Sequence, residues 1–126
     1  GSAIAGTLEG FRRADSGFGY RNVSPAYPVN RWKGFRSVGR FNAFVRTGAW
    51  LRNRADHYQN SAVWPFVEAR VVGALRSAGS TSEAEAASGR LLRRRGMSEW
   101  YSPTTGEPHG SNGQLWTAAA VISLTR

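Results

Sequence analysis

Two amphipathic segments separated by one tight turn constrain the fold of this chain more than any other feature. Apolar residues recur with a helical period over residues 63–78, and a second apolar stripe follows over residues 80–96. Pro65 suits a first helical turn and Gly79 suits a helix end. Because the joint is so short, the sequence predicts an antiparallel helical hairpin. The apolar stripes consist of Val63, Phe66, Val67, Val71, Ala74, Leu75 and Ala78 on the first helix and Ala84, Ala87, Leu91 and Leu92 on the second.

The second helix carries signals at both ends. Ser80 and Glu83 have the spacing of a capping box, and Gly96 marks the end. The run 93–95 is all arginine, which predicts a solvated helix end whose cations match the macrodipole. A third helix is expected over residues 114–124. Its buried side is predicted to hold Trp116, Ala119, Ala120, Ile122 and Ser123.

The remainder of the chain has weaker patterns. Residues 1–36 are rich in Gly, Ser, Pro and aromatics, and we expect an irregular segment with room for one short strand. Residues 37–52 suit a helix or a strand equally, and residues 53–61 suit a loop. The prediction is one mainly α domain over 1–126, with helical hairpins from residue 37 onward. The alternative is a small β-rich barrel with 41–51, 63–75 and 115–124 as strands.

Composition limits the class of protein. The chain has 126 residues, no cysteine and a net charge of +9, with ten of its 17 cations before residue 62. Disulfides and thiolate metal sites are therefore excluded. No apolar run approaches the roughly 20 residues of a membrane span, and no signal-peptide pattern is visible. We expect no membrane partner. The cytoplasm is favoured as compartment, although nothing in the sequence fixes it.

The residues with chemical potential are one carboxylate and a group of aromatic side chains. His57 and His109 lie far apart in sequence and have no ligand-type neighbours, and no phosphate-binding glycine motif occurs, so we expect no metal and no cofactor. Glu99 could act as a general base. The aromatic residues that could form sugar-binding walls are Trp64, Trp100, Tyr101 and Trp116, with Tyr58 and Asn60 at the mouth of the first helix. The alternative is that the tryptophans anchor a core and Glu99 is a capping or surface acid.

Three blocks of sequence resemble the C-terminal part of the α/α-toroid glycosidases, which include trehalases, amylo-glucosidase-like proteins, processing α-glucosidases and neutral invertases. The blocks are 19–25 (GYRNVSP), 57–66 (HYQNSAVWPF) and 98–101 (SEWY) followed by 113–119 (GQLWTAA). The second block is similar to a Y-H-N-G-x-x-W-P pattern and the third to E-x-Y … G-x-x-W-(S/T)-x-A. Residues 29–56 match nothing in these patterns.

The resemblance implies an activity and a site. In trehalase-like members the Glu of the closing block is the catalytic base of an inverting hydrolase, and here that position is Glu99. The same resemblance implies that Tyr58, Asn60, Trp64 and Trp116 line the sugar subsite. Gln59 and Ser61 depart from the usual His and Gly.

Inversion also needs a second carboxyl group roughly 6.5–9.5 Å away. In these enzymes it comes from a helix far upstream that has no counterpart here. The stand-ins are Asp56, Glu68 and Glu107. We therefore expect a hydrolase domain that is incomplete alone. Its partners would be an α-glucoside or related oligosaccharide, and either a second copy of the chain or a missing N-terminal catalytic part.

A rival interpretation is a small basic module that binds nucleic acid or another polyanion. Cations and aromatic residues alternate in the first half of the chain, as backbone contacts combined with base stacking require. The cations are Arg12, Arg13, Arg21, Arg31, Lys33, Arg36, Arg40 and Arg46, and the aromatic residues are Phe18, Tyr20, Trp32, Phe35 and Phe41.

Overall fold

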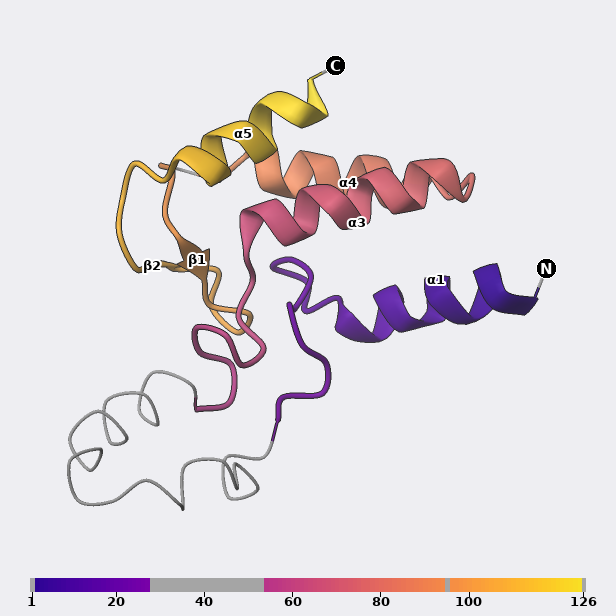
Figure 1. The fold of residues 1–126 in the computed structure, drawn as a ribbon, viewed down its shortest axis with the longest axis horizontal. Coiled ribbons are helices and arrows are strands. Elements are labelled where there is room, and N and C mark those ends of the chain that lie inside the picture. Colours follow the sequence, from indigo (N-terminus) through magenta and orange to yellow (C-terminus); the bar gives the residue numbers. More distant parts are fainter. Residues whose placement is uncertain (1, 28–53, 95, 126) are drawn as a thin grey trace, which may run out of the picture.

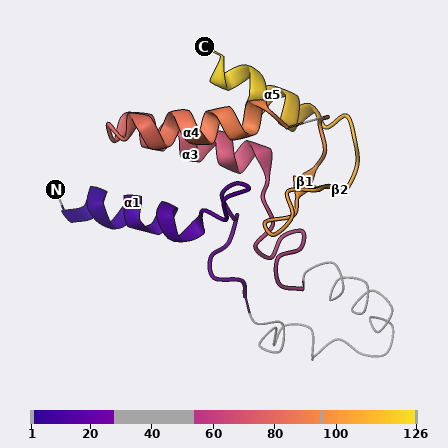
Figure 2. The same ribbon diagram turned by 180° about the vertical axis from the view of Figure 1, so that it is seen from behind.

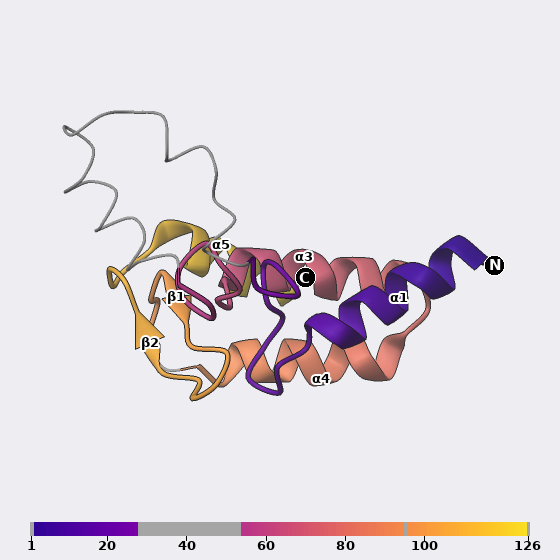
Figure 3. The ribbon, with the colours of Figure 1, turned by 90° about the horizontal axis from the view of Figure 1, so that it is seen from below.

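The computed structural model describes residues 2–27, 54–94 and 96–125, which are mainly helical (Figure 1). Helices α3 and α4 form a middle layer, with α1 on one face and α5 on the other (Figures 1 and 3). Two short strands pair antiparallel beside this stack, with Trp100 opposite His109. The elements are α1 (Ser2–Ala14), α3 (Pro65–Ser77), α4 (Thr81–Leu92), β1 (Trp100–Tyr101), β2 (Pro108–His109) and α5 (Leu115–Leu124).

The helical hairpin predicted from the apolar stripes is confirmed in α3 and α4. Pro65 opens α3, and Gly79, with φ of +76°, provides the left-handed turn after it. Val72 and Leu75 of α3 pack against Ala87 and Leu91 of α4, all of them fully or almost fully buried. Burying such side chains supplies the main stabilisation, about 25 cal/mol per Å² of apolar surface. The hairpin is therefore a core element and also the scaffold for the segments at its end.

The prediction of an irregular segment is wrong for residues 2–14, which form helix α1, whereas residues 15–27 contain only bends, isolated bridges and irregular backbone. Ile4, Leu8 and Phe11 recur at spacings of four and three, which is a helical stripe. Leu8, Phe11 and Ala14 pack against the core of the hairpin. Glycines at positions 6 and 10 obscure this pattern, since glycine lowers helix propensity by about 1 kcal/mol relative to alanine. Packing on the hairpin compensates for the weak propensity.

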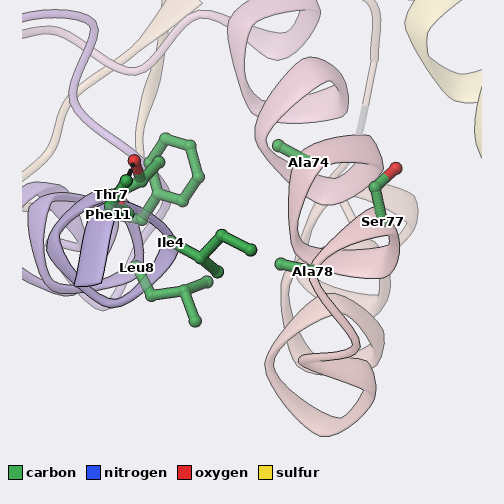
Figure 4. Close-up of a pocket in the computed structure, with 8 residues that line it drawn as sticks. Ile4, Thr7, Leu8, Phe11, Ala74, Ser77 and Ala78 are labelled. Atoms are coloured by element: carbon green, nitrogen blue, oxygen red, sulfur yellow. Dashed lines mark hydrogen bonds between the residues drawn. The ribbon is translucent and has the colours of Figure 1, made fainter. Parts of the chain in front are cut away.

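Helix α1 does not close completely on α3. A cavity of about 370 Å³ separates them, lined on one side by residues of α1 that include Ile4 and Leu8, and on the other by Ala74, Ser77 and Ala78 (Figure 4). Its walls are almost entirely apolar, and Ile4 remains largely exposed at its rim.

Helix α5 buries a different face from the predicted one. Thr117, Ala120 and Leu124 are its buried residues, whereas Trp116 and Ile122 are exposed. Of the predicted side, only Ala120 is buried, and Ala119 and Ser123 are exposed too. The helix carries no charged residue, so its sequence has little polarity from which to assign an inner face. The buried face is selected by Thr117, whose hydroxyl donates to the Ser98 carbonyl oxygen at 2.9 Å.

The details at the ends of α4 also differ from prediction. Ser80 makes no side-chain bond to the helix backbone; its hydroxyl donates to Glu83, which is ion-paired with Arg12 of α1. Helix α4 ends at Leu92, so the arginine run lies at and beyond its C-terminus. Arg94 is not solvated, because its side chain is 10 % exposed and contacts the carboxylate of Glu68. A tertiary partner, rather than the helix dipole, accounts for this arginine.

The β-rich barrel is excluded over the described residues, since two of its three expected strands are the helices α3 and α5. The third expected strand, residues 41–51, lies outside the described residues, as do the helix-or-strand assignment of 37–52 and part of the 1–36 segment. In the part of the chain that is described, no helix has the length and apolarity to cross a bilayer.

The start of α3, the end of α4 and the start of α5 lie at the same end of the stack as the β1–β2 hairpin (Figures 1 and 2). Val63, two residues before α3, exchanges both backbone hydrogen bonds with Tyr101 of β1, at 2.8 and 3.0 Å. Val63 also forms an antiparallel bridge with Arg21. Three segments that are far apart in sequence, around residues 21, 63 and 101, are thereby joined.

Candidate functional site

Glu99 lies directly before β1 and is held by the loop that follows β2. Its backbone N–H donates to the Ser111 carbonyl oxygen at 3.0 Å. In return, the Ser111 N–H and the Ser111 hydroxyl both donate to Glu99 Oε2, each at 3.3 Å. The side chain is partly buried, and none of the described residues forms a hydrogen bond or ion pair with Oε1. Glu99 is thus a carboxylate with one oxygen oriented and the other open to a water or a ligand.

The loop that holds Glu99 depends on a glycine and on the start of α5. Gly110 has φ of +76°, and a Cβ there would lie 2.5 Å from Glu99 Oε2 and 3.1 Å from Trp100 Cδ1. The Gln114 side-chain amide donates to the Ser111 hydroxyl, and the Gln114 N–H donates to the Met97 carbonyl at 2.9 Å. The Glu99 carboxylate is therefore oriented by the Ser111 N–H and hydroxyl, and the Ser111 hydroxyl is held in turn by the Gln114 side chain.

A Gly110→Ala variant is expected to lose about 1–3 kcal/mol of unfolding free energy, from the left-handed backbone and from the contact with Glu99. Gly113→Ala is the matched control, because Gly113 has φ of +71° but no atom within 4 Å of its added Cβ. Urea unfolding of both variants measures the difference. Equal losses would show that Gly110 does not approach the Glu99 side chain as closely as described.

Three of the predicted aromatic residues come together beside Glu99. Trp100, its chain neighbour, packs with Trp64 and Ala62, and Tyr58 flanks the same cluster. The Tyr58 and Trp64 ring centroids are 5.3 Å apart, and the Trp64 Nε1–H donates to the Tyr58 carbonyl at 2.9 Å. Trp64 is 4 % exposed and Trp100 is 8 % exposed, so both indoles are buried.

Two histidines extend this cluster, although the sequence shows them far apart. The His109 ring stacks on Trp100 with centroids 4.4 Å apart and planes 19° apart, and the His57 ring lies 5.7 Å from Trp100. Burial lowers the pKa of His57, and the positive charge of Arg54 lowers it further. Both effects favour the neutral imidazole, which can accept a hydrogen bond. The pairing of Trp100 with His109 across β1 and β2 brings those two rings together, and no local sequence pattern predicts it.

The loop before α3 is strained where the resemblance expects subsite contacts. Asp56, Tyr58 and Ser61 all have positive φ, between 43° and 83°. Such conformations cost about 1–3 kcal/mol each for residues other than glycine and gather at functional sites. Asn60 is buried, and its side-chain amide bridges the backbone N–H and carbonyl of Tyr27 at 2.6 and 2.9 Å. Asn60 therefore has a scaffold function here, and its predicted contact with sugar stays a prediction.

Trp116 does not join the aromatic cluster. It lies in the first turn of α5 and is 46 % exposed, and no ring contact to it occurs among the described residues. Its backbone nonetheless lies near Glu99, because the flanking residues Gln114 and Thr117 bond to the carbonyls of Met97 and Ser98. The indole is available to a ligand or to another polypeptide.

Two of the three carboxylates proposed as stand-ins for the general acid form ion pairs with arginines. Asp56 is paired with Arg21 at 3.3 Å. Glu68 is fully buried, 2.5 Å from Arg94. Glu107 is exposed beyond the turn that joins β1 to β2. None of the three has the environment of Glu99, which is partly buried and held by neutral donors.

The cations of the rival polyanion-binding interpretation divide into two groups. Arg12, Arg13 and Arg21 form ion pairs with Glu83, Glu9 and Asp56. The remaining five, Arg31, Lys33, Arg36, Arg40 and Arg46, lie outside the described residues together with Trp32, Phe35 and Phe41. Polyanion binding therefore remains an untested prediction.

A helical hairpin that presents an oriented carboxylate beside aromatic rings is an arrangement suited to glycoside hydrolysis. Residues 34–117, more than half of the chain, match the family model described as the mannosylglycerate hydrolase MGH1-like glycoside hydrolase domain, and the chain belongs to this family. The family supports the predicted glycosidase relationship, but not the trehalase or amylo-glucosidase type that the sequence blocks suggested.

Two curated relatives show the same relationship. A mannosylglycerate hydrolase from Rubrobacter radiotolerans is 36 % identical over 70 residues, covering 53 % of this chain and 16 % of the relative. A glucosylglycerate hydrolase from Mycolicibacterium hassiacum is 39 % identical over 77 residues, covering 55 % of this chain and 16 % of the relative. The chain therefore spans about one sixth of the length of each relative.

Proposed function

We propose that this chain carries the general base of an inverting glycoside hydrolase, with Glu99 as that base. The observation that supports it best is the asymmetric environment of the Glu99 carboxylate. One oxygen accepts two hydrogen bonds from Ser111, and the other has no partner among the described residues. A general base needs an ionised carboxylate with one oxygen free to take a proton from water. A surface acid with only a structural function is expected to form an ion pair on the outside of the protein. Among the described residues, Glu99 forms no ion pair.

The proposed reaction is a single displacement. Glu99 Oε1 accepts a proton from a water molecule, and that water attacks the anomeric carbon from the face opposite the leaving group. The bond from the anomeric carbon to the glycosidic oxygen breaks, and a second carboxyl group protonates that oxygen. The two Ser111 donors keep the carboxylate pointing in one direction. In this proposal the sugar ring lies beside the aromatic cluster of Trp64 and Trp100, whose second member directly follows Glu99 in the chain.

We place the substrate among glycosides of glycerate rather than among general α-glucosides. The names of the two relatives give mannosylglycerate and glucosylglycerate as their substrates. Glycerate carries a carboxylate, and a chain with a net charge of +9 attracts anions. The α-glucosides and oligosaccharides expected from the sequence remain the alternative substrate class.

The general acid is proposed to come from polypeptide outside this chain. Arginines neutralise Asp56 and Glu68, so the best internal candidates are already paired. Helix α5 also exposes Leu115, Trp116 and Ile122, a face that a charge-free helix normally buries. A further segment of a longer hydrolase would cover this face and bring the acid to the opposite side of the sugar.

Binding of the two glycerate glycosides tests this proposal on the chain itself. We expect glucosylglycerate or mannosylglycerate to shift the NMR signals of the Trp100 indole and the Ser111 amide, with affinity in about the millimolar range, about −4 kcal/mol. Glu99→Gln should retain binding, because the base acts on water and not on the sugar. Trp100→Phe should weaken binding about tenfold, and Trp116→Ala decides whether that residue belongs to the subsite. No shift with either glycoside at high concentration would contradict the proposal.

A further inference from the structure

Arg94 makes three tertiary contacts with one guanidinium group. Its Nη1 lies 2.5 Å from the carboxylate of Glu68 on α3, and its Nη2 donates to the Phe18 carbonyl oxygen at 2.6 Å. The group also lies over the Tyr101 ring of β1, 4.7 Å from the centroid. Gly19 permits this approach, because a Cβ at that position would collide with Arg94 Nη2. A planar guanidinium can make several such contacts at once, which a lysine cannot.

The contact between Arg94 and Tyr101 closes a loop that contains Glu99. Arg94 lies just after α4, Tyr101 lies on β1, and Glu99 lies between them. The Tyr101 hydroxyl closes the same loop a second time, donating to the Gly96 carbonyl at 3.3 Å. On its outer side Tyr101 is bonded through its backbone to Val63. The segment that contains Glu99 is therefore fixed at both ends. Arg94, at its first end, contacts Tyr101 at the other end and Glu68 of α3.

Stability alone does not account for this buried ion pair. Glu68 is 0 % exposed, and neither of its oxygens has a well-directed hydrogen bond among the described residues. Removing two charges from water costs several kcal/mol per ion, and replacement of a buried pair by apolar residues of similar volume is often neutral or stabilising. The presence of a charged pair at the junction of α3, the 16–20 loop and β1 is therefore weak evidence that the pair serves stability.

The geometry points to Glu68 and Arg94 as positioning residues for Glu99, acting through Tyr101. This inference rests on the proposed function of Glu99 as base. The pair fixes the loop between α4 and β1, so that the Glu99 carboxylate stays within reach of the Ser111 donors. Neither residue touches the substrate.

The Ser111 amide proton provides a direct readout of this positioning. Because it donates to Glu99 Oε2, its chemical shift should change in a single step as the Glu99 carboxylate is protonated. Glu99→Gln should abolish the step, which identifies its source. The readout needs no substrate. A failure of the glycoside-binding experiment therefore refutes the proposed function without affecting this test.

The decisive variant replaces both members of the pair, Glu68→Leu with Arg94→Met. We expect a folded chain with a melting temperature close to that of the wild type, and loss of the Ser111 step. Arg90→Met is the matched control, since Arg90 lies in the last turn of α4 shortly before Arg94, pairs with Asp15 at 2.9 Å and lies over the Tyr20 ring. Tyr20 is not on β1, so the step should persist in Arg90→Met.

An unchanged Ser111 step in the folded double variant overturns the inference. Should the double variant fail to fold, Arg94→Lys replaces it, because lysine keeps the charge beside Glu68 but cannot also bond Phe18 and stack on Tyr101. The step should then be clearly reduced in amplitude. A full step in Arg94→Lys, in a chain of normal stability, equally overturns the positioning function.

Discussion

Replacing Glu99 by Gln is expected to lower the rate of glycoside hydrolysis by about 10²–10⁴-fold, the usual contribution of a general base. Glutamine keeps the shape and can still accept the two Ser111 hydrogen bonds, but it cannot take a proton from water. The rate is measured with glucosylglycerate and mannosylglycerate on this chain and on the longest polypeptide that contains it. KM should change little, because the loss is confined to the chemical step.

The matched control for this experiment is Glu107→Gln. Glu107 lies on the same loop-rich segment but is exposed. Its replacement should leave the rate within about twofold, since surface substitutions are usually within 0.5 kcal/mol. A Glu99→Gln protein that hydrolyses at the unaltered rate removes Glu99 from the mechanism. An equal loss in both variants would instead indicate a general effect of charge.

Replacing Arg94 alone by Met is expected to cost about 3–5 kcal/mol of unfolding free energy, because it leaves the Glu68 carboxylate buried without its partner. This is a large share of the 5–15 kcal/mol that holds a typical domain folded. Denaturation by urea at pH 7 measures the loss. Arg93→Met is the control: that side chain is exposed beside the end of α4, and its loss should change stability by less than about 0.5 kcal/mol.

The same variant should show a characteristic pH dependence. Burial raises the pKa of Glu68, and Arg94 opposes this rise in the wild type. Without Arg94 the pKa of Glu68 in the folded state rises further above its unfolded value, so the native state binds a proton more readily than the unfolded state. Stability is then highest below the unfolded pKa and is lost as the pH rises through the folded pKa.

Arg94→Met should therefore become more stable as the pH falls from 7 towards about 5, relative to the wild type. Glu83 does not obscure this window, because hydrogen bonding to Arg12 lowers its pKa and keeps it ionised there. A variant whose stability falls in parallel with the wild type over this range would show that Glu68 remains charged or becomes hydrated.

The local patterns succeeded where a single segment holds its own signal. The α3–α4 hairpin follows from period, Pro65 and Gly79, and α5 begins and ends within a residue of its predicted range. Helix α1 was missed because Gly6 and Gly10 weaken a stripe that only packing on the hairpin stabilises. The buried face of α5 was misassigned because a helix without charges carries no amphipathic signal.

The candidate site shows the same division. Glu99, Tyr58, Trp64 and Trp100 were found from sequence, and the structure brings the last three into one cluster next to the first. Ser111, His57 and His109 were not found as neighbours of the site. Their contacts depend on the register of β1 with β2 and on the left-handed turn at Gly110, and no short-range pattern specifies either.

By itself, the sequence determined the helical hairpin, the carboxylate flanked by aromatic residues and the family resemblance, because each of these is carried by residues within one short segment. Only the tertiary structure decided which oxygen of Glu99 is held, which rings meet and why Arg94 turns inward. The physical reason is that hydrogen bonds and burial act between atoms in space. Ser111 lies 12 residues from Glu99 and Phe18 lies 76 from Arg94, and such separations become contacts only when the whole chain packs.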